Sequence, residues 1–268
     1  MQIYTHTLPG GAQLIGYLRD RNVEMPAFNT RPAILILPGG GYAWCSRREA
    51  DPVAMQFLQA GYNVFTLYYT CRSDETVPAL RWQPLIDAAG AILHIRRNAE
   101  QFGTDPAKIA ICGFSAGGHL AASTAILWDA EPVQTALGIH GTEARPDAVV
   151  LGYPVITRGN TATTAPLSTS AAMTRPARHN EPGKPVRDGL PPFFVWHTVE
   201  DPSVPVQNSL MLAGALTAHK VPLELHLFAH DGHGTSTCTR EVNTPNKHNS
   251  AWVALCTDWL AETFDFHL

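Results

Sequence analysis

The stretch CGFSAGGH at residues 112–119 decides the fold of this chain. An apolar run at 108–111 precedes it and an Ala-rich run at 120–127 follows it, which indicates a strand, a sharp turn and a helix. Gly-x-Ser-x-Gly in that context is typical of a nucleophile elbow, in which the turn lifts a serine hydroxyl out of a sheet. Glycines flank the serine because a Cβ atom there would collide with the neighbouring strand and helix. The sequence therefore predicts that Ser115 is a nucleophile.

Length, composition and charge favour one globular domain over residues 1–268. Hydrophobic residues make up 45% of the chain, which is ample for a large core. The net charge is −4 and no block of Lys or Arg stands out, so we expect no nucleic-acid partner. No apolar run approaches the length of about 18 residues that indicates a membrane span, so we expect no membrane partner either.

The N-terminus and the cysteines favour a cytoplasmic location. Residues 1–20 contain neither a basic region nor a continuous apolar region, so they do not resemble a signal peptide. The cysteines are odd in number and scattered, with no Cys-x-x-Cys, and we expect them to be reduced thiols. They are Cys45, Cys71, Cys112, Cys238 and Cys256.

Strand-like and helix-like segments alternate along the chain, which predicts an α/β fold with a mainly parallel sheet and helices on both faces. Two short β-runs at 3–19, around a Pro-Gly-Gly turn, come first. The later strands are expected at 33–37, 62–69, 108–111, 148–151, 193–196 and 223–228, and the helices at 52–60, 84–99, 116–128, 206–219 and 250–264.

The segment 157–191 interrupts this alternation. It is rich in Pro, Thr, Ser, Arg and Gly, and it is too long for an ordinary connection. One interpretation is a solvent-exposed loop, and the other is a cap over the active-site end of the sheet. We predict a small cap-like insertion.

A serine hydroxyl is a weak nucleophile, so it needs a base that takes its proton and an acid that orients the base. The acid is expected in the turn after the apolar run at 193–196, which is where Asp201 lies. Its nearest competitor is Glu200, whereas the run at 148–151 leads into residues without a carboxylate. We predict that Asp201 is the orienting acid.

The base is expected after the next strand, where the chain reads HDGHG at residues 230–234. His233 is flanked by glycines, so its ring can lie across the end of the sheet without steric obstruction. His230 is closer to the end of the strand, and we expect it to be exposed or to lie behind the base. We predict that His233 is the base.

The negative oxygen of a tetrahedral intermediate needs preorganised N–H donors. Ala116 supplies one amide at the start of the helix after the elbow, and the glycine-rich loop at 38–42 supplies another. Gly40 and Gly41 are the best donors in that loop, and the sequence does not rank them. A phosphate-binding loop is the alternative, but neither G-x-x-x-x-G-K-[ST] nor G-x-G-x-x-G with its acidic partner occurs.

Several side chains near the predicted base are of metal-ligating types. His226 lies inside a predicted strand, and the sequence contains no H-E-x-x-H motif. Both observations argue against a metal site, so we predict none. The residues concerned are His226, His230, Asp231 and His233.

Taken together, these stretches resemble the bacterial acetyl-esterase and carboxylesterase branch of the α/β-hydrolase superfamily. That branch is related to hormone-sensitive-lipase-like esterases and acetylxylan esterases. The matching stretches follow one another in the order of that family and span most of the chain. They are LPGGGY at 37–42, GFSAGGHL at 113–120, GYPVI at 152–156, residues 195–205 with Asp201, and DGHG at 231–234.

The resemblance implies an α/β-hydrolase fold, a triad of Ser115, Asp201 and His233, and hydrolysis of short-chain, often acetyl, esters without a cofactor. It also implies a small-molecule ester as the partner and small homo-oligomers as the assembly. Pro38 stands where hormone-sensitive-lipase-like enzymes carry His, which favours the acetylxylan-esterase-like branch. The segment 157–191 lacks a long amphipathic helix, so we expect small soluble esters rather than long triglycerides.

Other functions stay open at this point. Within hydrolases they are a deacetylase that acts on xylan oligosaccharides or other sugar esters, a thioesterase and a formamidase. A peptidase with the same triad would carry a large extra domain, for which this chain has no room. From a different class, a non-catalytic small-molecule-binding homologue would lack one member of the triad, and none is missing here.

Overall fold

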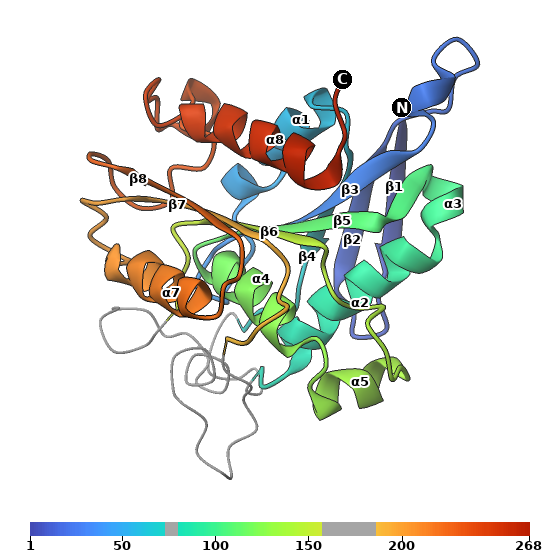
Figure 1. Ribbon diagram of the computed structural model, residues 1–268, viewed down its shortest axis with the longest axis horizontal. Helices are drawn as coiled ribbons and strands as arrows, with labels where there is room; N and C mark the ends of the chain where they lie inside the picture. The colour runs from blue at the N-terminus through green and yellow to red at the C-terminus, as the bar shows by residue number, and fades with distance from the viewer. Residues whose placement is uncertain (73–79, 157–185) are drawn as a thin grey trace.

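The computed structural model describes residues 1–72, 80–156 and 186–268 (Figure 1). The predicted cap at 157–191 lies mostly outside these residues. Of its last part, Val186 and Leu190 are buried in the hydrophobic core.

One eight-stranded sheet forms the centre of the described structure, in the order β1-β2-β4-β3-β5-β6-β7-β8 (Figure 1). Strands β1 and β2 form an antiparallel hairpin that pairs with β4, and every pairing from β4 to β8 is parallel. The predicted α/β fold with a mainly parallel sheet is therefore confirmed. The strands are β1 (Gln2–Thr7), β2 (Gln13–Leu18), β3 (Arg31–Leu37), β4 (Asn63–Tyr68), β5 (Thr104–Phe114), β6 (Ala148–Gly152), β7 (Phe193–Thr198) and β8 (Leu223–Phe228).

Helices cover both faces of this sheet (Figure 1). Helices α1 and α8 pack on one face, and α2, α4, α5 and α7 contribute to the core on the other. The helices are α1 (Asp51–Gln59), α2 (Gln83–Arg97), α3 (Ala99–Phe102), α4 (Ala116–Leu127), α5 (Glu131–Leu137), α7 (Gln207–Ala218) and α8 (Ala251–Phe264), with short 3-10 turns at Pro26–Phe28, Arg47–Glu49 and Arg240–Val242.

Strand β3 shows why its run of apolar residues is continuous. All seven of its residues are buried. Ala33, Leu35 and Leu37 face one core, and Ile34 and Ile36 face the other, because successive side chains of a strand point to opposite faces. A strand covered by helices on both faces therefore has no position for a solvated side chain.

Strand β5 and helix α5 are among the elements that differ from the prediction. Strand β5 begins at Thr104 rather than at 108, because its polar first half still pairs with β3 at Arg31. Helix α5 was not predicted, although Pro132 in its first turn and a left-handed Gly138 after its end are ordinary boundary signals. In the described part of the chain, no helix has the length and hydropathy to cross a bilayer.

The C-terminal segment packs at the edge where the central strands begin. The ring of Phe266 lies 6.2 Å from that of Phe28 and 5.8 Å from that of Tyr62, centroid to centroid. Tyr62 directly precedes β4, and Phe28 lies shortly before β3. The end of the chain is therefore at the opposite edge of the sheet from the carboxyl ends of these strands.

Helix α4 lies unusually close to the sheet at its first turn. A Cβ atom at Gly113 would overlap the carbonyl oxygen of Gly117, and one at Gly117 would overlap the carbonyl oxygens of Leu37 and Pro38. The flanking glycines of the elbow therefore allow backbone to contact backbone, as expected from the sequence.

The substitution Gly117→Ala should destabilise the protein, because the added methyl group meets the backbone at the end of β3. We expect the free energy of unfolding to fall by roughly 1–3 kcal/mol or more. Gly214→Ala is the matched control, since Gly214 also lies on a helix but has nothing within 4 Å of its Cβ position. That variant should gain about 0.5–1 kcal/mol. Urea denaturation measures both, and equal changes would contradict the packing argument.

Candidate active site

Ser115 is the turn residue between β5 and α4. Its backbone has φ 53° and ψ −117°, a conformation that costs a non-glycine residue energy and is typical of a nucleophile elbow. Both backbone groups are held by the neighbouring strand end: the Ser115 amide donates to the Gly152 carbonyl at 3.0 Å, and the Ser115 carbonyl accepts from the Val155 amide at 3.2 Å. The strained turn is therefore fixed from both sides.

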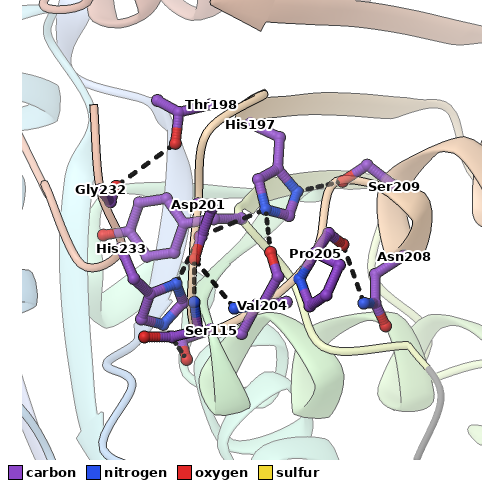
Figure 2. Close-up of polar contacts among 12 residues, drawn as sticks. Ser115, His197, Thr198, Asp201, Val204, Pro205, Asn208, Ser209, Gly232 and His233 are labelled. Atoms are coloured by element: carbon purple, nitrogen blue, oxygen red, sulfur yellow. Dashed lines mark hydrogen bonds and ion pairs between the residues drawn. The ribbon is translucent and has the colours of Figure 1, made fainter. Parts of the chain in front are cut away.

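A chain of hydrogen bonds links Ser115, His233 and Asp201 (Figure 2). The Ser115 hydroxyl is 2.8 Å from His233 Nε2, and His233 Nδ1 is 2.6 Å from Asp201 Oδ2. With the proton on Nδ1, the ring donates to Asp201, and Nε2 accepts the hydroxyl proton. The structure thus brings together the three residues that were selected from distant parts of the sequence.

The two competing residues lie apart from this chain of hydrogen bonds. His230 Nδ1 and Glu200 Oε1 are 3.0 Å from each other, and both side chains are exposed, at 81% and 60%. Neither is bonded to Ser115. The structure therefore links Ser115 to His233 and, through it, to Asp201, rather than to their neighbours.

Asp201 is held as an anion. Its buried side chain accepts the amides of Ser203 at 2.9 Å and Val204 at 2.8 Å through Oδ1. Burial alone would raise the pKa of this carboxyl, but hydrogen bonds from His197 and His233, the charge of His233 and the Val204 amide together hold the pKa well below its usual range. The carboxylate can therefore orient His233 and stabilise a positive charge on it.

His197 was not predicted to be part of the site. It is fully buried behind Asp201, with Nε2 at 3.3 Å from Asp201 Oδ2 and 2.9 Å from the Val204 carbonyl (Figure 2). Its Nδ1 is 2.8 Å from the hydroxyl of Ser209 on α7. His197 therefore connects Asp201 to strand β7 and to helix α7. Its spacing of four residues before Asp201 at the end of a strand is the sequence signal that could have found it.

The glycine-rich loop after β3 lies beside Ser115. A Cβ at Gly39 would be 3.0 Å from Ser115 Cβ, and the Gly39 amide donates to Glu49 Oε2 at 2.7 Å. Gly40 and Gly41 have φ values of 126° and 63°, which favour glycine. Because the Gly39 amide already has its acceptor, Gly40 and Gly41 are the next candidates for an oxyanion hole. Ala116 opens helix α4, so its amide belongs to the first turn, which lacks intrahelical acceptors.

Glu49 and Tyr153 are a second pair that was not predicted. The Tyr153 hydroxyl donates to Glu49 Oε1 at 2.7 Å, and its ring stands edge-on to that of His233 with centroids 5.0 Å apart. Burial raises the pKa of Glu49, although its hydrogen bonds and His233 oppose the shift. No local motif marks either residue in the sequence, because their contact joins positions 104 residues apart.

His119 lies one turn into α4, with Nδ1 at 2.7 Å from the hydroxyl of Tyr42, the residue that follows the three loop glycines. Both side chains are buried. Burial lowers the pKa of His119 to about 4, so the ring is neutral at neutral pH. This contact connects helix α4 to the glycine-rich loop.

The residues considered for a metal site have other partners. His226 Nε2 is 2.7 Å from Glu224 Oε1, and Asp231 accepts from the side chains of Asn246 and Asn249. Within residues 1–72, 80–156 and 186–268, no three His, Cys, Asp or Glu side chains are grouped so that they could hold a metal ion.

The family model for BD-FAE matches residues 22–216, which includes the glycine-rich loop, the elbow and the acid. The chain belongs to the BD-FAE family. Together with the sheet topology and the solved structures below, this confirms the predicted esterase branch of the α/β-hydrolase superfamily.

Two solved structures are similar to this chain over nearly its whole length. The carboxylesterase Cest-2923 from Lactobacillus plantarum WCFS1 is 28% identical, with a TM-score of 0.83, and the match covers 98% of each chain. The acetyl ester-xyloside bifunctional hydrolase from Caldicellulosiruptor lactoaceticus is 31% identical, with a TM-score of 0.74, over 97% of this chain and 91% of that one.

Among curated relatives, endo-1,4-beta-xylanase B of Butyrivibrio fibrisolvens is 36% identical over 238 residues, which are 85% of this chain and 35% of that protein. The chain spans between about a third and a half of the length of the first curated relatives that it matches. The matched region is therefore one part of these longer proteins.

The buried His119 should make stability depend on pH. Its pKa is about 4 in the folded protein and about 6.5 in an unfolded chain. Between these values the unfolded chain binds more protons, so the free energy of unfolding should fall by roughly 3 kcal/mol as the pH drops from 6.5 to 4. His119→Asn keeps a polar group near Tyr42 but does not titrate, so its curve should be flatter in this window. Urea denaturation across the window measures both, and parallel curves would contradict the assignment.

Proposed function

We propose that this chain is a serine carboxylesterase that hydrolyses short-chain, acetyl-type esters through an acyl-enzyme intermediate. The observation that carries the proposal is the chain of hydrogen bonds from Ser115 through His233 to Asp201, with contacts of 2.8 and 2.6 Å. The elbow conformation of Ser115 and the adjacent glycine-rich loop support the same assignment.

The mechanism follows from the position of each group. His233 Nε2 takes the hydroxyl proton while Ser115 Oγ attacks the ester carbonyl, and Asp201 stabilises the imidazolium that forms. The amides of Ala116 and of Gly40 or Gly41 hold the oxyanion. His233 then returns the proton to the departing alcohol. In the second half, His233 activates water in the same way, and the acid is released from Ser115.

The preference for short acyl groups rests on the sequence and on the relatives. The sequence at 157–191 has no long amphipathic pattern of the kind that forms a lid opening at an oil surface. A relative with 31% identity is named as an acetyl ester-xyloside hydrolase, which is consistent with an acetyl substrate.

A deacetylase of xylan oligosaccharides is the second candidate. It is favoured by the names of two relatives, an endo-1,4-beta-xylanase and the acetyl ester-xyloside hydrolase. The cytoplasmic location stays a prediction, which fractionation of the source cells would measure. The small homo-oligomer also stays a prediction, which gel filtration would measure.

Replacement of the proposed nucleophile tests the function. Ser115→Ala should lower kcat on 4-nitrophenyl acetate by a factor of at least about 10³, because the attacking oxygen is lost. The same variant should lose labelling by a fluorophosphonate, which separates an enzyme from a binding protein. The wild type should hydrolyse acetate faster than decanoate, and acetylated xylo-oligosaccharides in the same panel test the second candidate.

Asp201→Asn and Glu200→Gln form a matched pair of controls in this assay. Asn at 201 should favour the wrong tautomer of His233 and lower kcat by about 10⁴. Gln at 200 removes an exposed carboxylate that bonds only to exposed His230 in the described structure, and it should leave kcat unchanged. Near-normal turnover by Ser115→Ala, or equal losses in this pair, would reject the proposed mechanism.

A further inference from the structure

Glu49 is a buried acidic side chain that the proposed mechanism does not use. It closes the short turn Arg47–Glu49, ten residues after Gly39, and only 3% of it is exposed. Oε2 accepts the Gly39 amide and Oε1 accepts the Tyr153 hydroxyl, each at 2.7 Å. A carboxyl group removed from water in this way is costly unless its oxygens are hydrogen-bonded, and here each oxygen accepts one hydrogen bond.

The contacts of Glu49 join three segments of the site. Gly39 lies on the glycine-rich loop, and Tyr153 directly follows the end of β6. The Tyr153 hydroxyl also accepts the amide of Ser236, three residues after His233, at 2.9 Å. The ring of Tyr153 meanwhile contacts the ring of His233. One carboxyl group thus connects the loop of the oxyanion hole with the loop of the base.

The direction of these hydrogen bonds requires a side chain at position 49 that accepts two hydrogen bonds. The Gly39 amide can only donate, and the Tyr153 hydroxyl accepts from Ser236, so its own proton points to Glu49. An amide in place of the carboxyl group could accept only one of the two. The arrangement therefore fits a group with two acceptor oxygens rather than an amide of the same shape.

We propose that Glu49 is a positioning residue for the esterase reaction, which holds Gly39 against the nucleophile and, through Tyr153, holds the ring of His233. This inference rests on the proposed function. It assigns to Glu49 no contact with the substrate, only control over the two groups that act on it.

Glu49→Gln is the direct test, with Tyr153→Phe as the matched change at the other end of the same hydrogen bond. Each should lower kcat on 4-nitrophenyl acetate by about 10- to 100-fold and leave KM within about twofold, because groups that act in the transition state are displaced. The inhibition constant of a boronic acid that adds to Ser115 should rise in parallel with the loss in kcat/KM. The double variant should lose little more than either single one, since both break one network.

The outcomes separate this inference from the proposed function. Fluorophosphonate labelling of the wild type, absent in Ser115→Ala, tests the function without reference to Glu49. Unchanged kcat and boronate inhibition in Glu49→Gln, with normal labelling of Ser115, would overturn the positioning role alone. Losses in kcat that add up in the double variant of Glu49→Gln and Tyr153→Phe would also overturn the positioning role. If Glu49→Gln does not fold, as judged by circular dichroism, Tyr153→Phe decides the question by the same measurements.

A pair of thiols beside the glycine-rich loop carries a second, independent inference. Cys45 Sγ and Cys71 Sγ are 3.8 Å apart, and both thiols lie within reach of the Tyr69 carbonyl oxygen. Both residues are partly exposed, whereas Cys112, Cys238 and Cys256 are buried. A hydrogen bond from Cys45 lowers the pKa of the Cys71 thiol. Cys71 is thus the thiol better prepared to react as a thiolate.

We infer that Cys45 and Cys71 form a site of reversible disulfide formation with a low-molecular-weight disulfide as the oxidant. The Cys71 thiolate attacks one sulfur of the oxidant and releases one small thiolate. Cys45, after loss of its proton, then attacks the Cys71 sulfur of the mixed disulfide and releases the second thiolate. The two protein thiols lose two electrons and two protons, and the oxidant is reduced to two thiols.

Closure of this bond should affect the neighbouring loop. A disulfide needs about 2.05 Å between the sulfur atoms, so Cys45 and Cys71 must approach each other. Cys45 belongs to a compact turn in which the Ser46 amide donates to the Gly39 carbonyl at 2.9 Å and the Ala43 amide to the Gly40 carbonyl at 3.0 Å. Movement at Cys45 therefore reaches the proposed oxyanion amides, and the oxidised protein should turn over more slowly.

Equilibration with oxidised glutathione, followed by alkylation and mass spectrometry, tests the pair. The wild type should lose the mass of two hydrogens and yield one Cys45–Cys71 peptide, while the three buried cysteines stay unmodified as an internal control. Cys71→Ser and Cys45→Ser should lack this product, and Cys71→Ser should keep its turnover in the oxidant. Dithiothreitol should restore the mass and the turnover of the wild type. A wild type that keeps both thiols, or carries only glutathione adducts, would overturn the inference, whatever the esterase assay shows.

Discussion

The site depends on the contact between the first turn of helix α4 and the ends of strands β3 and β5. Gly113 and Gly117 leave no side chain between these backbones, so the helix starts directly against the sheet. Ser115 has a strained backbone at this contact. Its amide is bonded to Gly152 at the end of β6, and its carbonyl is bonded to Val155 just after β6. These backbone contacts therefore fix the position of the Ser115 hydroxyl independently of the other side chains of the site, which are arranged around it.

The fold and the central residues of the site could be predicted because parallel strands end at one edge of a sheet. Strands β5, β7 and β8 carry Ser115, Asp201 and His233 just beyond their ends, so the order of strands along the chain was enough to select the turns that carry them. The order of strands does not by itself separate Asp201 from Glu200, because the two residues are adjacent in the turn after β7. The structure separates them, since the turn after β7 buries one carboxyl group and exposes the other.

The groups that support this centre could not be predicted in the same way. Glu49 and Tyr153 lie 104 residues apart, and Tyr153 and Ser236 lie 83 apart, so no local spacing records their contacts. Glu and Ser are mostly surface residues, so their types did not indicate that Glu49 and Ser236 are buried. The role of His197 is also hidden, because a histidine within an apolar strand is most simply a core residue until the carboxylate beside it is seen.

The position of the C-terminal segment determines where a group attached to the end of the chain would lie. Phe266 packs beside Phe28 and Tyr62, where the central strands begin, whereas Ser115 lies where β5 ends. A linker, affinity tag or solid support joined to Leu268 would thus be attached on the far side of the molecule from Ser115. Immobilisation through this end therefore keeps the solid support away from Ser115.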